Sequence, residues 1–170
     1  MTSHRVRARR VGDDINTDYI IASTRKKETL DERILKQYLL EGVDPGFAAS
    51  VRPGDIIVAG ANFGCGSAME VAATVVLAAG IPIVLAKSFA RSFYRNAINN
   101  GLLVVECDTT AIREGDRVTV RMSGDSAGVR VVDRQLEISG TPLPAIMLRI
   151  LECGGLVPFL SANGGFGSIV

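Results

Sequence analysis

The feature that most constrains the fold is a buried strand followed by a glycine-rich turn and then by a helix. Residues 55–59 (Asp-Ile-Ile-Val-Ala) are a short apolar run of the kind found in buried strands. The turn at 62–66 (Asn-Phe-Gly-Cys-Gly) carries two glycines, which tolerate positive φ and let another group approach closely. We expect a helix over 69–79 and a second buried strand over 83–86. Strand, helix and strand in this order predict a right-handed crossover in a parallel sheet covered by helices.

The rest of the chain extends this pattern on both sides. Alternating polar and apolar residues predict a strand over 5–11, with its arginines exposed on one face. Further elements follow from apolar spacing: strands at 19–22 and 102–106, helices at 29–40, 89–98 and 142–151, a loop at 43–53, and short β segments at 117–122, 128–132 and 135–138. We expect a single mixed-sheet α/β domain over 1–170, with a loosely held tail at 161–170.

Length and charge narrow the range of partners. A chain of 170 residues suits one domain, and a net charge of +1 offers no electrostatic footprint for nucleic acid or an anionic membrane. The sequence contains no apolar run near the ~20 residues that a membrane-spanning helix needs, and no signal peptide opens it. We therefore expect a soluble, cytoplasmic protein with neither a nucleic-acid nor a membrane partner.

Metal-ligating residues are scarce. The three cysteines, Cys65, Cys107 and Cys153, are widely spaced and form no C-x-x-C pair, and their odd number argues against a disulfide framework. His4 is the only histidine. The sequence therefore predicts no zinc site, no iron–sulfur cluster held by this chain alone and no serine–histidine hydrolase.

Ser67 is the residue of this region with the clearest chemical potential. It follows the glycines and is expected on the first turn of the helix, where free N–H groups and a partial positive charge favour an anion. Ser67 and Glu70 also match an S-x-x-E capping box, which is a purely structural role. A Walker-type phosphate loop would need a lysine after Gly66, and a dinucleotide fingerprint would need a glycine at Met69. From these residues alone, both an anion-binding role and a helix-capping role remain possible for Ser67.

Several motifs, in this order and spacing, resemble a known family. They occupy residues 12–18, 62–67 with Glu70, 86–91, 94–96, 99–102 and 152–156. Together they are similar to the small subunit of 3-isopropylmalate dehydratase and of homoaconitase, which corresponds to the swivel domain of aconitase. The resemblance implies a β/β/α swivel fold and a hydro-lyase that isomerises 2- and 3-isopropylmalate by dehydration and rehydration in leucine biosynthesis. It also implies that a partner large subunit carries the iron–sulfur cluster and that this chain holds no cofactor.

The resemblance implies roles for the glycine-rich turn. It places the family's catalytic serine on Ser67, which as an alkoxide removes a proton from the substrate. In the usual sequence, Gly-Ser-Ser-Arg-Glu, a second serine and an arginine follow; here they are Ala68 and Met69, so the arginine that would grip a substrate carboxylate is missing. The residues expected to bind substrate or stabilise the serine anion are Asn62, Gly64, Cys65, Gly66, Ala68 and Met69.

A second departure lies in the loop that discriminates the substrate's side chain in this family. Here it contains Thr24, Arg25, Lys26 and Lys27. The three cations could replace the lost carboxylate contact or select a more anionic substrate, although these residues also suit a solvated turn before a helix. Four interpretations stay open. The chain could be a subunit acting on isopropylmalate, one acting on another 2-hydroxy di- or tricarboxylate (homoaconitate-like or alkylmalate), a non-catalytic regulatory or anion-binding subunit, or a free-standing phosphate or nucleotide binder that uses the helix N-terminus.

Overall fold

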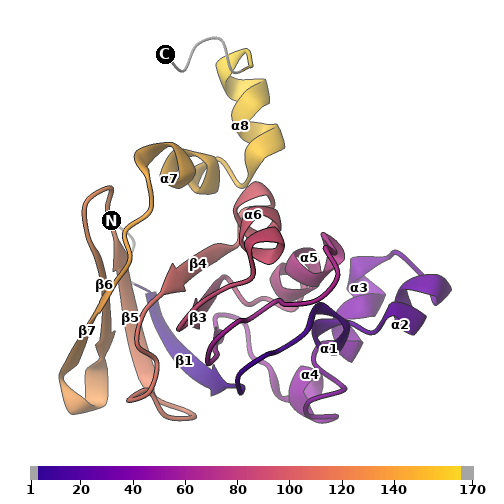
Figure 1. Cartoon of the computed structure of the whole chain (residues 1–170), viewed down its shortest axis with the longest axis horizontal. Coiled ribbons are helices and arrows are strands. Elements are labelled where there is room, and N and C mark those ends of the chain that lie inside the picture. Colours follow the sequence, from indigo (N-terminus) through magenta and orange to yellow (C-terminus); the bar gives the residue numbers. More distant parts are fainter. Residues whose placement is uncertain (1–3, 166–170) are drawn as a thin grey trace.

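The computed structural model describes residues 4–165 and shows one mixed sheet with helices packed against it (Figure 1). Seven strands lie in the order β4-β3-β2-β1-β5-β6-β7. The strands β4, β3, β2 and β1 run parallel, whereas β1, β5, β6 and β7 are antiparallel. The predicted parallel units and the later β segments are thus confirmed. The bounds are β1 His4–Arg10, β2 Ile56–Val58, β3 Ile83–Ala86, β4 Leu103–Glu106, β5 Arg117–Met122, β6 Ala127–Val131 and β7 Leu136–Gly140.

The sheet curls until its two edge strands nearly meet. An isolated antiparallel bridge joins Cys107, directly after β4, to Gly140 at the end of β7. The backbone N–H of Thr141 donates to the carbonyl of Glu106 at 2.8 Å. Because β2 and β3 are covered on both faces, their sequences are continuous apolar runs rather than alternating ones. The inner face buries Val6, Ala8, Ile56, Val58, Ile83, Leu85, Val105, Cys107, Ile112, Val118, Val120, Ala127, Val129 and Val131.

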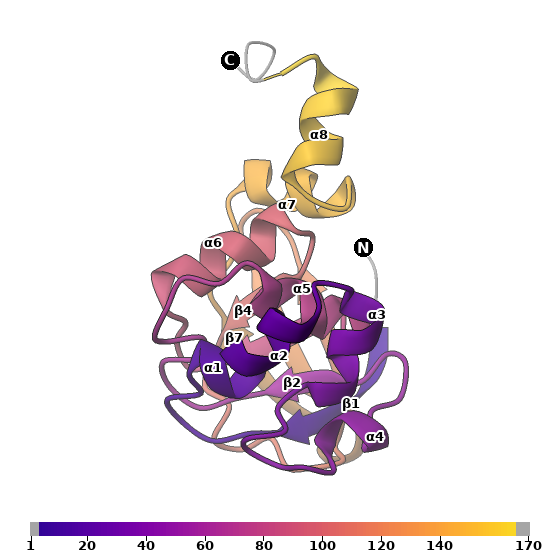
Figure 2. The same cartoon turned by 90° about the vertical axis from the view of Figure 1, so that its right-hand side faces the viewer.

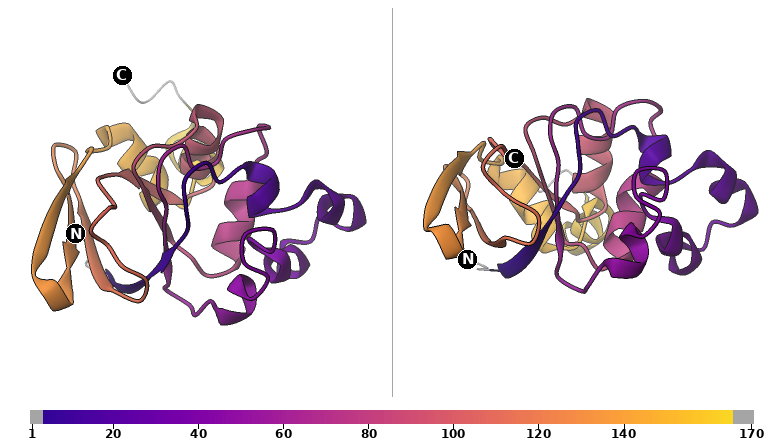
Figure 3. Two further views of the ribbon diagram at one scale, coloured as in Figure 1. Left: turned by 60° about the horizontal axis from the view of Figure 1, so that its bottom comes forward. Right: turned by 90° about the horizontal axis from the view of Figure 1, so that it is seen from below.

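The helices pack against the other face of the parallel strands and bury a second, larger apolar core there. In Figure 1, α1 to α5 gather at one side, while α6, α7 and α8 lie above β4. Figure 2 shows α8 projecting beyond the rest, and Figure 3 shows α2 at the outer end of the helical side. The bounds are α1 Thr17–Ile20, α2 Ser23–Glu28, α3 Glu32–Leu35, η1 Lys36–Tyr38, α4 Phe47–Ser50, α5 Val71–Ala78, α6 Arg91–Asn99, η2 Val132–Arg134, α7 Ala145–Glu152 and α8 Leu156–Asn163.

The strand predicted over residues 19–22 is wrong. The side chain of Asn16 accepts a hydrogen bond from the backbone N–H of Asp18 and caps the short helix α1. Ile20 and Ile21 are still fully buried, so the apolar pattern is explained by a helical turn packed on the core rather than by a strand.

The single helix predicted over residues 29–40 is also wrong. The chain is extended at Thr29, where α2 ends, and the Asp31 side chain caps a separate helix, α3, which continues into η1. The loop predicted at 43–53 contains a short helix, α4. Local capping side chains therefore divide this region into short helices where apolar spacing alone indicated one long helix.

The arginines of β1 are not all exposed, contrary to the prediction. Arg9 is only 7% exposed, and its guanidinium lies 4.7 Å from the centroid of the Phe47 ring. Its Nε donates to Glu114 at 2.9 Å, and Asp55 lies 3.6 Å from its Nη1. Two carboxylates from neighbouring segments allow this arginine to be buried.

The C-terminal part is more helical than predicted. The helix expected at 142–151 is confirmed as α7, and α8 continues through Asn163, into the segment expected as a loose tail. The end of that predicted tail, 166–170, lies outside the described residues. Within residues 4–165 no single helix is long and apolar enough to cross a membrane; α7 and α8 together have the length and composition, but they are bent by 93° relative to each other.

Candidate active site

The glycine-rich turn is held against the polar segment that follows β1. The backbone N–H of Gly64 donates to the carbonyl of Ile15 at 2.8 Å, and that of Thr17 donates to the carbonyl of Cys65 at 2.8 Å. An isolated parallel bridge pairs Asn16 with Cys65. The two segments thus form one platform beyond the carboxyl ends of β1 and β2, where open parallel sheets commonly bind ligands.

Both glycines of the turn are required by its geometry. Gly64 has φ +79° and Gly66 has φ +89°, which favour glycine. A Cβ on Gly66 would lie 2.6 Å from the side-chain amide of Asn16, and one on Gly64 would collide with Phe93. The positive φ and close approach expected from the sequence are therefore confirmed.

Asn62 begins the turn in a left-handed conformation, with φ +58°. Its side-chain Nδ2 donates to Asp14 at 2.8 Å, and its backbone N–H donates to the Ser88 hydroxyl at 2.8 Å. The backbone N–H of Ala61 donates to Asp13 at 2.7 Å. No individual role was predicted for Asp13 and Asp14; their position after a strand, among turn-forming residues, is the signal that could have assigned them to loop support.

An aromatic cluster anchors the turn to the core. The Phe63 ring is fully buried and meets the rings of Phe93 and Phe89 edge-on, with centroid distances of 5.1 Å and 6.1 Å. The backbone N–H of Ala90, which precedes α6, donates to the Phe63 carbonyl at 2.9 Å. The turn is therefore tied to α6 as well as to the segment after β1.

Ser67 lies at the exposed end of this turn. Its carbonyl accepts a hydrogen bond from the hydroxyl of Thr17 at 2.8 Å, and Thr17 is only 1% exposed. Among the residues that the structure describes, none accepts a hydrogen bond from the backbone N–H groups of Gly66 through Glu70. The segment therefore presents a solvent-facing hydroxyl beside a run of free backbone donors.

The predicted helix N-terminus at Ser67 is wrong. Helix α5 begins at Val71, its N-cap position is Glu70, and no side chain caps it. The carboxylate of Glu70 instead accepts a hydrogen bond from the Asn100 side chain at 3.1 Å. Because Thr17 holds the carbonyl of Ser67 and Asn100 engages Glu70, the S-x-x-E sequence does not form a capping box.

The fold brings the side chains of Met69 and Lys26 into contact. Met69 is buried, with 8% of its surface exposed, while its neighbour Ala68 is exposed. The Lys26 Nζ lies 3.3 Å from the Met69 Sδ. A residue of the predicted specificity loop thus contacts the position at which the resemblance implies a missing arginine.

The predicted specificity loop is a helix, α2, and its cations differ in their surroundings. Arg25 donates to Glu41 at 2.9 Å and 3.1 Å, and its guanidinium lies 3.9 Å from the centroid of the Tyr38 ring. The hydrogen bond to Glu41 is the main reason that the pKa of Arg25 is raised. Thr24 and Lys27 are exposed. Arg25 is therefore engaged within the fold, and Lys26 is the cation of this helix that faces Met69.

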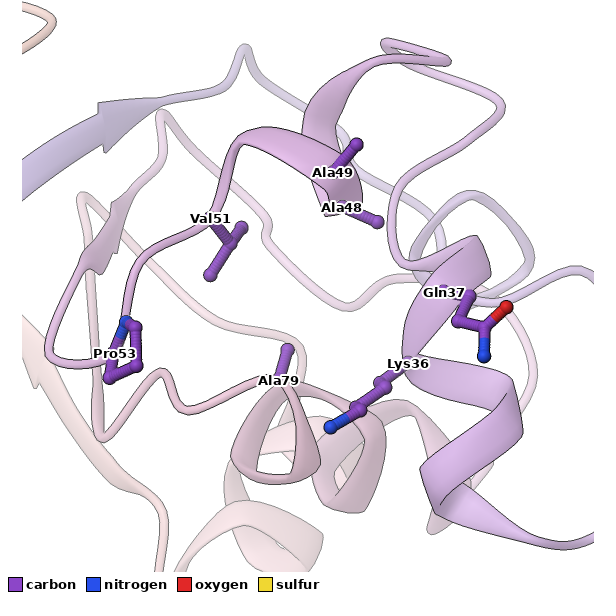
Figure 4. A pocket seen from close by; sticks show the side chains of 7 residues that line it. All are labelled: Lys36, Gln37, Ala48, Ala49, Val51, Pro53 and Ala79. Carbon is purple, nitrogen blue, oxygen red and sulfur yellow. The ribbon is translucent and has the colours of Figure 1, made fainter.

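A cavity of about 540 Å³ lies elsewhere, at the opposite end of α5 (Figure 4). It is lined by Lys36, Gln37, Ala48, Ala49, Val51, Pro53 and Ala79. None of the residues expected to act on substrate belongs to it, so we do not assign it to the candidate site.

The three cysteines do not form a metal centre on this chain. All are free: Cys65 is half-buried, Cys107 is buried and Cys153 is exposed. Burial raises the pKa of the Cys107 thiol to about 11, which disfavours the thiolate that ligates metals. Within residues 4–165, no three histidine, cysteine or acidic side chains lie close enough to hold a metal ion.

Residues 15–110 match the model of the aconitase C-terminal domain. The chain belongs to the aconitase C-terminal domain family. It is 47% identical over 155 residues to 3-isopropylmalate dehydratase small subunit 1 of Methanopyrus kandleri, a match that covers 90% of this chain and 89% of that protein. It is 42% identical over 151 residues to the isopropylmalate/citramalate isomerase small subunit of Methanocaldococcus jannaschii, covering 88% of each.

The architecture agrees with this family. The crystal structure of 3-isopropylmalate dehydratase from Methanocaldococcus jannaschii matches with a TM-score of 0.90 at 37% identity, covering 96% of both chains. The mixed α/β swivel fold and the family implied by the sequence motifs are therefore confirmed. The roles assigned to Ser67, to the residues of its turn and to α2 stay predictions.

Proposed function

We propose that this chain is the small subunit of 3-isopropylmalate dehydratase, an aconitase-family hydro-lyase that acts with a separate large subunit. The reaction removes water from a 2-hydroxy dicarboxylate and returns it with the hydroxyl on the neighbouring carbon. The observation that carries the proposal is the near-complete match to relatives of this name, at 41–47% identity over 89–93% of the chain.

Ser67 is the base in this proposal. Its hydroxyl is exposed at the carboxyl end of the parallel strands, on a turn fixed by Thr17 and the two glycines. As an alkoxide, Ser67 Oγ takes a proton from a substrate carbon; the C–H electron pair becomes the second bond of C=C, and hydroxide leaves the adjacent carbon. Rehydration reverses these steps on the other carbon. A positioned base of this kind contributes about 10²–10⁴-fold to the rate.

A serine acts as a base only where its anion is stabilised. The free backbone N–H groups from Gly66 to Glu70 are suited to this, because preorganised donors stabilise negative charge at little reorganisation cost. Since α5 begins at Val71, the stabilisation would come from the turn itself rather than from the first turn of a helix. No histidine is needed for this arrangement.

The iron–sulfur cluster implied by the resemblance belongs, in this proposal, to the large subunit, where it supplies Lewis-acid chemistry. The three dispersed cysteines of this chain do not fit such a cluster. The contribution of the chain is therefore a base and substrate contacts, and it should be inactive without its partner.

A second candidate substrate is a smaller alkylmalate. The relative from Methanocaldococcus jannaschii is named an isopropylmalate/citramalate isomerase small subunit, at 42% identity. Met69 and Ala68 both depart from the family's usual polar residues, which favours a change in substrate contacts. Citramalate therefore belongs among the substrates to be tested.

Reconstitution with the cognate iron–sulfur large subunit tests the proposal. The mixture should dehydrate isopropylmalate, or citramalate in the second case, as followed by ultraviolet absorption of the unsaturated product, while each subunit alone should not. Turnover by this chain alone, or failure of a mixture with an intact iron–sulfur cluster to convert any malate derivative, would refute the proposal.

A further inference from the structure

A lysine without a carboxylate partner lies against Met69, two residues after the candidate base. Lys26 is half-buried, and its ammonium is 3.3 Å from Met69 Sδ, which is only a weak acceptor. Within residues 4–165 it forms no ion pair. The carboxylate of Asp18 accepts hydrogen bonds from the hydroxyl and backbone N–H of Ser23, which are the main reasons that the pKa of Asp18 is lowered. The charge of Lys26 contributes to this lowering without an ion-pair contact. A half-buried ammonium with such weak contacts can still bind an anion.

Free donors on the adjacent segment point to the same ligand chemistry. Met69 belongs to the run from Gly66 to Glu70 whose backbone N–H groups have no acceptor among the described residues. A cation and a run of free N–H groups are the donors that recognise a carboxylate. These two observations are independent, because one concerns a side chain of α2 and the other the backbone before α5.

The neighbouring cations of α2 are less suited to this role. Arg25 is bound to Glu41, lies within 3.6 Å of Glu28 and stacks on Tyr38. Lys27 is exposed, and within residues 4–165 its ammonium forms no hydrogen bond to Met69. Lys36, an exposed lysine at the cavity near the opposite end of α5, offers a control in which the same charge is removed outside the candidate site.

We propose that Lys26 binds a carboxylate of the malate-type substrate, as the cation that Met69 cannot supply. This inference rests on the proposed function and adds a specificity residue to it. The ammonium extends from α2 to Met69, which follows Ser67 on the segment before α5. Its role is to hold the substrate rather than to move a proton.

Steady-state kinetics of the reconstituted two-subunit enzyme test this inference. For isopropylmalate and citramalate, Lys26→Gln should raise KM about 10- to 100-fold, the effect of one or two charge-assisted hydrogen bonds, with kcat little changed. Lys26→Arg should restore most of the affinity. The control Lys36→Gln, at an exposed lysine outside the candidate site, should change KM by less than about fivefold, as expected for a surface charge. An unchanged KM in Lys26→Gln, or an equal rise in Lys36→Gln, would overturn the inference while leaving the proposed function standing.

A binding measurement separates this inference from failure of the proposed function. The chain alone, carrying ¹³C-methyl methionine, would be titrated with isopropylmalate and with its uncharged diamide, using Met69→Leu to assign the Met69 methyl signal. The dicarboxylate should shift that signal in the wild type, and the shift should disappear with the diamide or in Lys26→Gln. No shift in the wild type, or an equal shift in Lys26→Gln, contradicts the role of Lys26 whatever the activity of the mixture.

Discussion

Ser67 is positioned through backbone contacts and through its neighbours. Its carbonyl is held by the buried hydroxyl of Thr17, and Gly66 leaves room for the side chain of Asn16. Asn16 in turn caps α1, so a single side chain supports both the helix and the turn. The orientation of the candidate base therefore depends on residues that need not touch the substrate.

Gly66→Ala should impair catalysis beyond its effect on stability. A non-glycine residue at φ +89° costs about 1–2 kcal/mol, and the new methyl group would also displace Asn16. Gly115→Ala is a matched control, because Gly115 has φ +80° but a Cβ added there would meet no atom within 4 Å. In urea unfolding, both variants should lose stability, and the loss in Gly66→Ala should be at least as large as that in Gly115→Ala. Only Gly66→Ala should show a lower kcat. Equal kcat values in both variants would show that the close packing on Asn16 does not position Ser67.

Among the elements, β1 is joined to the start of β2 by ionic contacts with one buried carboxylate. Asp55, directly before β2, is 3% exposed, and it accepts hydrogen bonds at 2.9 Å from Arg7 Nε and from the Arg52 backbone N–H. Burial alone would raise the pKa of Asp55, but these hydrogen bonds and the charges of Arg7 and Arg9 outweigh it and hold the pKa below its usual value. The contact fixes the two strands from which the polar platform extends.

Asp55→Asn should destabilise the fold and change its response to acid. Because the folded-state pKa is depressed, the stabilisation is present above the ordinary carboxyl pKa of about 3.9 and is lost as pH falls through the lower folded-state value. Loss of the hydrogen bonds to this charged carboxylate costs about 1.5–3 kcal/mol, because Arg7 is partly exposed and stays solvated. The variant should lose less stability than the wild type as the pH falls below about 4. Chemical denaturation across pH measures both effects. Asp133→Asn, in an exposed pair with Arg117, should have little effect; a comparable loss there would contradict the assignment to Asp55.

The elements also show what could be predicted from sequence. The parallel strands were predictable because strands buried on both faces are continuous apolar runs, and the turn because its glycines have no substitute. The start of α5 was not, because it depends on contacts of Ser67 and Glu70 with residues distant in the chain. The contact between Lys26 and Met69 is likewise a tertiary one, and no local pattern encodes it.

On the scale of the whole molecule, the nearly closed sheet acts as a rigid base for one polar platform. The edges meet through Cys107 and Gly140, and the platform lies at the carboxyl ends of β1 and β2. Ser67 and Ala68 are exposed there, as expected of residues that meet a substrate held partly by another protein. In the proposed function this chain is thus one half of an active site, with the base on the small subunit and the remaining chemistry on the large one.

The most direct test is the turnover of the reconstituted enzyme when Ser67 is replaced by alanine. Ser67→Ala should lower kcat by about 10²–10⁴-fold, while the variant still assembles with the large subunit and unfolds at nearly the wild-type denaturant concentration, because its carbonyl contact with Thr17 remains. Ser126→Ala, an exposed serine in the turn between β5 and β6, should keep wild-type kcat. A Ser67→Ala enzyme that retains near-native kcat would contradict the assignment of Ser67 as the base.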